Sequence, residues 1–147
     1  MQAGELTLAH LTPKDTENFL GKEGYAVYEM KTSDYRGILF NFWNSYWTEN
    51  RDLIPAVCCA IDRQAILDAV VLGRGTTAYS PLQRNVYNNE DVERYDYDPE
   101  RSRSILEDAG CVMGSSGFYE RNGQEVGFVL SVGAGDQVRL DMAQAAA

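Results

Sequence analysis

The sequence has few of the residues on which catalysis and metal binding depend. His10 is the only histidine among 147 residues, and an isolated histidine is more often structural or exposed than a general base. No serine or cysteine stands beside a base in a recognisable motif. The acidic run 88–93 lacks the spacing and the glycine of a calcium-binding loop, so we expect a solvated turn there. The sequence therefore predicts no catalytic residue, no metal ligand and no cofactor, and we expect no enzyme.

A long apolar run and a basic cluster are also missing. No stretch stays apolar over the length of about 20 residues that spans a bilayer, and residues 1–10 lack the basic start and apolar run of a signal peptide. The 13 Lys and Arg are outnumbered by 22 Asp and Glu, which gives a net charge of −9. Phosphate binding requires clustered Lys and Arg, so nucleic acid is not an expected partner.

The three cysteines do not form a pattern typical of disulfides or zinc sites. Cys58 and Cys59 are adjacent, and adjacent side chains on a helix point roughly 100° apart, so both cannot easily face one metal. We expect at least one of them to be a small buried apolar side chain. With Cys111 the count is odd, and cysteine usage leaves the redox compartment open.

What the chain does contain is enough apolar sequence for a folded domain. Hydrophobic residues make up 44% of it, which argues against disorder. The sequence ends inside an alanine-rich helix-forming run and begins close to a strand-like run. We therefore expect residues 1–147 to be a single domain that is an excised part of a longer protein.

Capping residues predict two helices with clear ends. The first begins at Thr12, with Pro13 in its first turn, and ends at Gly21. The second begins after Asp98, the predicted N-cap, and ends at Gly110.

Residues 52–72 have apolar side chains three to five positions apart. This spacing predicts one amphipathic helix, or two helices with a break at Asp62. Asp52 and Asp62 are the expected caps of the two pieces, and Gly73 is the expected end. We expect Ile61 and Ile66 to face a sheet. Residues 74–97 form a long connection, of a length usually found in functional or wrapping loops.

Strands are predicted where β-branched and aromatic residues gather. These segments are 5–11, 25–32 and 35–43, followed by a hairpin over 117–132 with Asn122 and Gly123 at its turn. Gly37 marks a bulge or a close approach of the backbone. Because strands alternate with helices, we predict an α/β fold with a mixed β-sheet flanked by helices.

Aromatic side chains concentrate in the segment 35–47. In a strand, Asn41 and Trp43 share the face opposite Phe40 and Phe42. One face belongs to the core, and the other, with Tyr35 and the following loop, lines a ligand cleft or packs on another domain. Tyr35, Asn41 and Trp43 are therefore candidate ligand-binding residues.

A second candidate site is the glycine loop that precedes the last predicted helix. It comprises Gly133, Ala134, Gly135, Asp136 and Gln137. The loop lacks the Lys-Ser/Thr pair of a nucleotide-binding P-loop and the third glycine of a dinucleotide fingerprint. Free N–H groups and the helix dipole favour a carboxylate there, although a plain strand-to-helix turn is the alternative. We expect Gly135 to be required by a close backbone approach or a positive φ.

Four segments, taken in order, resemble one protein family. They are AGELTLAHLTPKD (3–15), YRGILFNFWN (35–44), AVCCAIDRQAILDAVVLGRGTTAYSPL (56–82) and YDYDPERSRSILEDAG (95–110). They are similar to segments of the large extracytoplasmic solute-binding proteins of ABC transporters, a group that holds dipeptide, oligopeptide and nickel receptors. The last two segments are the most specific, and the four are spread along the chain from residue 3 to residue 110.

The resemblance implies a partial lobe of a two-lobed, periplasmic-binding-protein-like fold, here the second lobe. It implies a lipid-anchored, extracytoplasmic protein that closes around a small solute and passes it to a membrane permease. The partners it implies are a peptide, the permease and the missing first lobe. Asp62 would cap its helix beside Arg63, and neither would do chemistry.

Two alternatives stay open at this point. One is an enzyme domain whose active site is completed by residues outside the chain, and the other is an interaction module that exposes its aromatic side chains. Nickel and oligosaccharides remain alternatives to a peptide solute.

Overall fold

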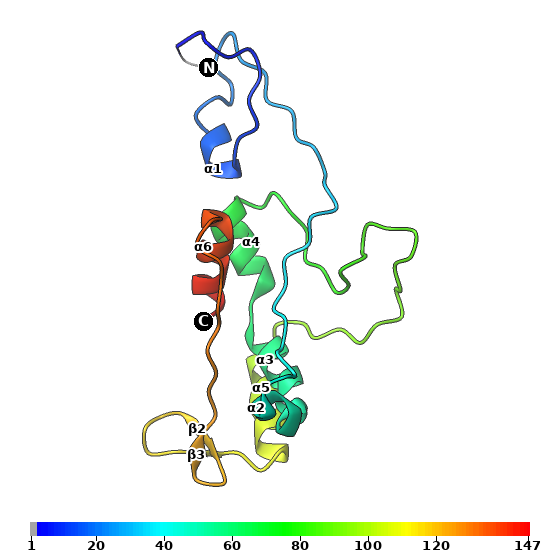
Figure 1. Cartoon of the computed structure of the whole chain (residues 1–147), viewed down its shortest axis with the longest axis vertical. Helices are drawn as coiled ribbons and strands as arrows, with labels where there is room; N and C mark the ends of the chain where they lie inside the picture. The colour runs from blue at the N-terminus through cyan, green and yellow to red at the C-terminus, as the bar shows by residue number, and fades with distance from the viewer. Residues whose placement is uncertain (1–2) are drawn as a thin grey trace.

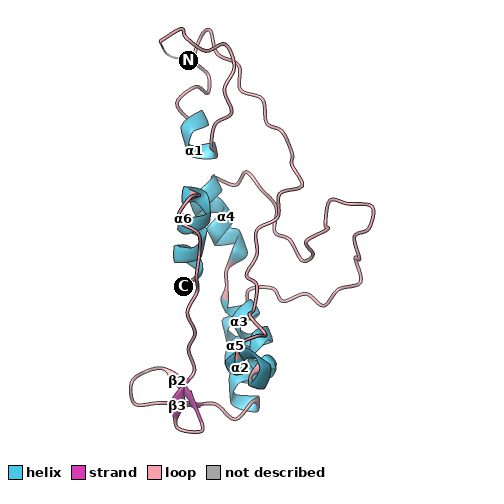
Figure 2. Ribbon diagram, in the orientation of Figure 1, coloured by secondary structure: helices cyan, strands magenta, loops and turns pink. Residues whose placement is uncertain are grey.

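The computed structural model describes residues 3–147, which form short helices and one small sheet joined by long loops (Figures 1 and 2). The helices are α1 (Pro13–Thr16), α2 (Ser45–Glu49), α3 (Ile54–Ala60), α4 (Arg63–Val71), α5 (Pro99–Asp108) and α6 (Gln137–Ala146). A 3-10 turn, η1 (Arg51–Leu53), precedes α3, and the strands are β1 (Val112–Met113), β2 (Tyr119–Arg121) and β3 (Gln124–Glu125). Over the described residues, no helix is both long enough and apolar enough to cross a membrane.

Most of the predicted helix caps are confirmed. The Asp62 carboxylate accepts a hydrogen bond from the Ala65 N–H at 2.9 Å, which places the break between α3 and α4 at that residue. The Asp98 carboxylate accepts from the Arg101 N–H at 2.9 Å, and Gly110 ends α5 with a φ of +80°. Thr12 caps α1 through its side chain, although that helix is only four residues long.

Asp52 does not cap α3, contrary to the sequence-based expectation. The helix follows η1 directly, and its N-cap residue, Leu53, makes no side-chain capping bond. Both oxygens of the Asp52 carboxylate instead accept hydrogen bonds from the Arg121 guanidinium, at 3.1 and 2.8 Å. A two-point pairing of a carboxylate with arginine satisfies both carboxylate oxygens with charge-assisted hydrogen bonds, so Asp52 fastens β2 to η1.

The core lies where α3 packs on α5. Leu53 is 1% exposed and Cys59 is fully buried. The Ser102 hydroxyl of α5 donates to the Ala56 carbonyl of α3 at 2.9 Å, which satisfies the buried polar atom. Burial of Cys59 confirms the expectation that at least one of the adjacent cysteines is a small buried apolar side chain, and Cys111 is buried as well.

A second packing unit is formed by α4 and α6, which lie side by side in Figure 1. Ile61 follows α3 and Ile66 lies in α4, and both are half-buried. Within residues 3–147 the principal packing partner of α4 is a helix, α6, and not the sheet that was expected beneath Ile66.

Trp47 connects α2 and the segment just before it to residue 128, which is distant in sequence. It lies in α2, a short helix that the sequence analysis treated as a loop, and it is buried. Its ring lies 4.7 Å from the Phe40 ring and 5.1 Å from the Phe128 ring, measured between centroids, both edge-on. Edge-on aromatic contacts of this kind stabilise the fold beyond the burial of apolar area. Trp47 thus holds Phe40 and Phe128 together.

The sheet is antiparallel, with the strand order β1-β2-β3. Val112 pairs with Glu120, and Glu120 pairs with Glu125. Asn122 and Gly123 have φ values of 53° and 76°, the positive values that a type I′ turn requires. The predicted hairpin turn is confirmed.

Several predicted strands are absent from the structure. Residues 5–11, 25–32, 35–43 and 127–132 follow drawn-out paths, and none pairs with a neighbouring strand anywhere in residues 3–147. A strand is stabilised by hydrogen bonds and side-chain pairs with a neighbour, and these segments run alone. The predicted combination of helices with a sheet is present, but the sheet is small and antiparallel rather than mixed.

Candidate functional site

The candidate site is a large, partly open cavity, which we call the central cavity. Its volume is about 2490 Å³. Residues 24–41 line one side, while residues 73–78, residues 127–133 and parts of α4 and α6 line the others. Ligand pockets are concave and combine apolar walls with a few polar groups. The central cavity has this character, because Tyr35, Phe40 and Phe128 share its wall with charged side chains.

Four of the eight predicted ligand-binding residues lie on the wall of the central cavity. They are Tyr35, Asn41, Gly133 and Asp136. They come from two segments about a hundred residues apart in sequence, the first predicted site and the glycine loop. The structure therefore brings both predicted sites to one cavity.

The other four predicted residues, Trp43, Ala134, Gly135 and Gln137, are not among the residues that line the cavity. The Trp43 side chain is 99% exposed. The backbone N–H of Trp43 donates a hydrogen bond to the Asn41 side-chain oxygen at 3.1 Å. The Gln137 side-chain amide donates to Asp141 at 2.7 Å, one turn along α6. Their assignment as ligand-binding residues stays a prediction.

Asp136 occupies the N-terminus of α6, where a bound carboxylate was expected. Its carboxylate accepts the Arg139 N–H at 3.1 Å and pairs with the Arg36 guanidinium at 2.8 Å. The Arg139 N–H and then the charge of Arg36 lower the pKa of Asp136 below its ordinary value. The positive end of α6 is therefore already partly neutralised by a carboxylate of the chain itself.

The glycines of the loop are not required by backbone strain. A Cβ added at Gly133 or Gly135 would meet no atom within 4 Å, and neither residue has a positive φ. The expectation of a positive φ at Gly135 is wrong, and no described protein atom approaches it closely; a close approach to a solute stays a prediction. A substitution there would meet neither a clash nor a forbidden conformation.

Gly37, in contrast, does mark a close approach, as the sequence suggested. A Cβ at this position would lie 2.6 Å from the Tyr35 hydroxyl and 2.9 Å from atoms of its ring. The Tyr35 ring therefore folds across residue 37, which orients the ring at the cavity wall. A side chain at residue 37 would force it away.

Arg36 is the site residue that the sequence analysis missed. Its side chain is half-buried at the cavity wall, where it pairs with Asp34 at 3.2 Å and with Asp136 at 2.8 Å. The pairing of Arg36 with Asp34 could have been found from the sequence, because residues two apart in an extended chain share a face. Its pairing with Asp136 could not be read from the sequence.

Arg63 fastens the long connection 74–97 to the start of α4. Its guanidinium donates to the Tyr95 carbonyl and lies 5.3 Å from the centre of the Tyr79 ring. The Arg94 guanidinium lies 4.9 Å from the same ring. A hydrogen bond from Tyr95 to Glu93, followed by burial, raises the pKa of Tyr95 to about 12. Asp62 and Arg63 thus have structural contacts, one as a cap and the other as an anchor.

The whole chain, residues 1–147, matches the middle region of the bacterial extracellular solute-binding proteins, family 5. Protein XP55 of Streptomyces lividans is 32% identical over 146 residues, which is 99% of this chain and 27% of that protein. The oligopeptide-binding protein AppA of Bacillus subtilis is 30% identical over 107 residues, which is 66% of this chain and 20% of that protein. The chain thus spans about a quarter of the length of these relatives.

A solved structure shows the same fold. The crystal structure of NikZ from Campylobacter jejuni in complex with Ni(L-His) superposes with a TM-score of 0.80 and 24% sequence identity. The superposition covers 92% of this chain and 27% of NikZ. The drawn-out path of the chain therefore corresponds to a region of a much larger folded protein.

Proposed function

Because the chain belongs to family 5 of the bacterial extracellular solute-binding proteins, we propose that it is part of the substrate-binding component of an ABC-type uptake system. In this proposal the protein binds a peptide by closure of two lobes and delivers it to a membrane permease. The chain forms part of the second lobe, and the full-length protein is held at the cell surface by a lipid anchor.

The observation that carries the proposal is the family match over all 147 residues. The family resemblance noted from four motifs is confirmed by that match. One relative, AppA, is named as an oligopeptide-binding protein, and the structural neighbour NikZ was solved in complex with Ni(L-His); both support binding rather than catalysis as the role of the chain.

The central cavity supports a peptide as the solute. Arg36 and Asp136, which pair with each other at 2.8 Å, bring a cation and an anion to the wall of the cavity, which Tyr35 also lines. A peptide carries an ammonium group, a carboxylate and apolar side chains, so it offers partners to all three. Closure around such a solute would shift the equilibrium between open and closed lobes by the difference in affinity of the two states.

The test is titration calorimetry of the full-length protein with a pool of defined di- to pentapeptides. A parallel titration uses the nickel–histidine complex, and glycerol serves as a neutral control solute. We expect a micromolar or tighter dissociation constant for at least one peptide class. Saturable binding of nickel–histidine with no peptide binding would replace the peptide by a metal chelate. Absence of binding in both titrations would overturn the proposed solute classes.

A further inference from the structure

Residues 3–39, which we call the N-terminal arm, form one side of the central cavity without belonging to either packing unit. The arm contains α1 and the drawn-out segment that descends toward α2, shown as the blue to cyan trace in Figure 1. None of its described residues is buried, whereas α3 and α5 share a core. Apolar side chains of the arm, such as Leu11 and Phe19, are only half-buried, so polar contacts are expected to contribute to its position.

The contacts between the arm and the other described residues include a set of ion pairs. Within residues 3–147, no backbone hydrogen bond connects the arm to the remainder. The ion pairs are Arg74 with Glu17 at 2.6 Å, Arg74 with Glu29 at 3.2 Å, Lys14 with Asp141 at 3.2 Å, and Arg36 with Asp136 at 2.8 Å. Two of the four pairs use the same guanidinium.

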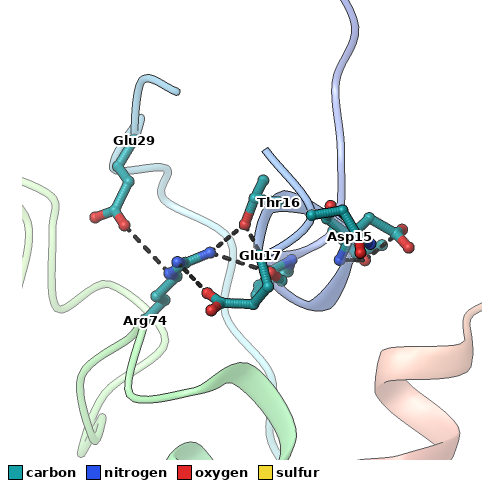
Figure 3. A network of polar contacts seen from close by, with 8 residues as sticks. Asp15, Thr16, Glu17, Glu29 and Arg74 are labelled. Carbon is teal, nitrogen blue, oxygen red and sulfur yellow. Dashed lines mark hydrogen bonds and ion pairs between the residues drawn. The ribbon is translucent and has the colours of Figure 1, made fainter. Parts of the chain in front are cut away.

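Arg74 is the centre of this attachment (Figure 3). One terminal nitrogen donates to Glu17 at 2.6 Å, and the other donates to the Pro13 carbonyl at 3.1 Å and to the Thr16 hydroxyl. The Nε atom faces Glu29. Arginine offers five donors in a rigid plane, an arrangement that lysine cannot reproduce.

The end of α4 explains why Arg74 reaches the arm. Leu72 and Gly73 have φ values of 57° and 72°, so the chain turns through two left-handed residues directly after the helix. Arg74 follows that turn, and its N–H donates to the Val71 carbonyl at 3.0 Å. The guanidinium is thereby directed from a fixed point on α4 toward the arm.

Arg74 also connects two separate parts of the arm. Thr16 is the last residue of α1 and Glu17 is the residue after it, while Glu29 lies in the segment 24–41 that lines the cavity. One side chain thus sets the position of α1 and of the cavity wall relative to α4. Its own side chain is 21% exposed, less than either carboxylate partner.

We propose that Arg74 is a positioning residue that holds the N-terminal arm against α4 and keeps the arm side of the central cavity ordered before solute enters. The effect of Arg74 on solute binding rests on the proposed function. The effect of Arg74 on the order of the arm does not, because it concerns the protein without ligand. A wall that is already ordered loses less conformational freedom when a solute binds.

The test is hydrogen–deuterium exchange of the full-length protein, followed by mass spectrometry of peptides that cover residues 12–31. Arg74→Gln removes the charge and most of the donors, and Arg74→Lys keeps the charge. Arg103→Gln is the matched control, because Arg103 pairs with Glu100 of its own helix and does not line the cavity. The variant Glu17→Gln with Glu29→Gln removes the same pairs from the arm.

We expect about tenfold faster exchange in residues 12–31 for Arg74→Gln and for the double glutamate variant, with α3 and α5 unchanged. Arg74→Lys should fall between wild type and Arg74→Gln, and Arg103→Gln should match wild type. Raising NaCl from about 50 to about 500 mM should speed exchange of the arm more in wild type than in Arg74→Gln, where only the pairs of Lys14 and Arg36 remain to be screened. Equal arm exchange in all proteins, or an equal salt response, would overturn the positioning role.

Peptide titration separates this inference from the proposed function. If wild type binds a peptide, Arg74→Gln should raise the dissociation constant several-fold, mainly through faster dissociation. An unchanged dissociation constant would overturn the link to solute. If wild type binds none of the pool, the proposed peptide function fails, and the exchange experiment still decides the role of Arg74 in the arm.

Discussion

At the scale of single residues, two aspartates that flank α3 have different partners. The Asp52 carboxylate pairs with the Arg121 guanidinium, whereas the Asp62 carboxylate caps α4. Asp136 was expected to help bind an incoming carboxylate, and it supplies a carboxylate itself. Residue type and spacing therefore do not determine whether a carboxylate pairs with an arginine or caps a helix.

Cys58 provides a test of burial at a single thiol. Burial raises the pKa of Cys58, so little thiolate forms at neutral pH. Cys59 and Cys111 are buried in the core. We expect one thiol to react slowly with Ellman's reagent in the native chain and three after denaturation. Cys58→Ser should abolish the native reaction, and unchanged native reactivity in that variant would show that the assignment is wrong.

The lowered pKa values of Asp136 and Asp141 predict how the stability of the protein responds to acid. Asp136 faces Arg36 and Arg139, and Asp141 faces Gln137 and Lys14; these contacts lower both pKa values. A carboxylate whose pKa is lower in the folded state stabilises it above the unfolded pKa, about 4. That stabilisation is lost as pH falls through the lower folded values.

The measurement is the melting temperature of wild type and of Asp136→Asn with Asp141→Asn, followed from pH 6 to pH 2. Wild type should lose stability below about pH 4 more steeply than the double variant. Asp91→Asn with Asp96→Asn is a control with the same change in charge, outside the arm contacts. Parallel curves for wild type and the Asp136 and Asp141 variant would argue against the predicted linkage.

At the scale of elements, the two packing units differ from the arm in how they are stabilised. Leu53 is 1% exposed between η1, α3 and α5, whereas Leu39 in the arm is 93% exposed. In the 147-residue chain, Leu53→Ala should lower the free energy of unfolding by about 2–5 kcal/mol. Leu39→Ala should change it by less than about 0.5 kcal/mol. Urea melts of both variants decide this, and similar midpoints would contradict the location of the core.

The helices and the hairpin turn were predictable because their signals are local. Asp98, Pro99 and Gly110 mark the two ends of α5 within a few positions, and the Asn122–Gly123 pair specifies its own turn. The strands were not predictable in the same way, because a strand depends on a partner that the sequence does not name. Residues 25–32 have the composition of a strand and no partner strand among residues 3–147.

The candidate site shows the same division. Tyr35 and the glycine loop were found from aromatic and glycine patterns, and the structure brings parts of both to one cavity. The pairs of Arg36 with Asp136 and of Arg74 with Glu17 join residues 100 and 57 positions apart. No periodicity or motif connects such positions, so these contacts required the folded chain.

At the scale of the whole molecule, the chain corresponds to about a quarter of the proteins it resembles. It exposes large apolar side chains that include Leu8, Tyr28 and Val129, at 85%, 85% and 89%. Exposure of this kind is typical of a surface that contacts another part of a protein. In the proposed function, that part is the remainder of the same receptor.

The chain alone should therefore bind peptides poorly. In the proposed two-lobe arrangement, the chain alone lacks the wall of the cleft that the first lobe supplies, so the contacts made on closure cannot form. Calorimetry of the 147-residue chain with the peptide pool should show no binding at micromolar concentrations, while the full-length protein binds. Micromolar binding by the chain alone would contradict the two-lobe proposal.

The two tryptophans have a consequence for spectroscopy. Trp47 is buried against Phe40 and Phe128, while Trp43, four residues earlier, is 99% exposed. The chain therefore contains one fluorophore shielded from water and one fully hydrated, close together in sequence. Trp43→Phe should shift the emission maximum to shorter wavelength and reduce quenching by acrylamide, while Trp47→Phe should leave a red-shifted, readily quenched signal. With Trp43→Phe as the parent protein, the remaining emission reports on the joint between α2 and residue 128 as solute is added.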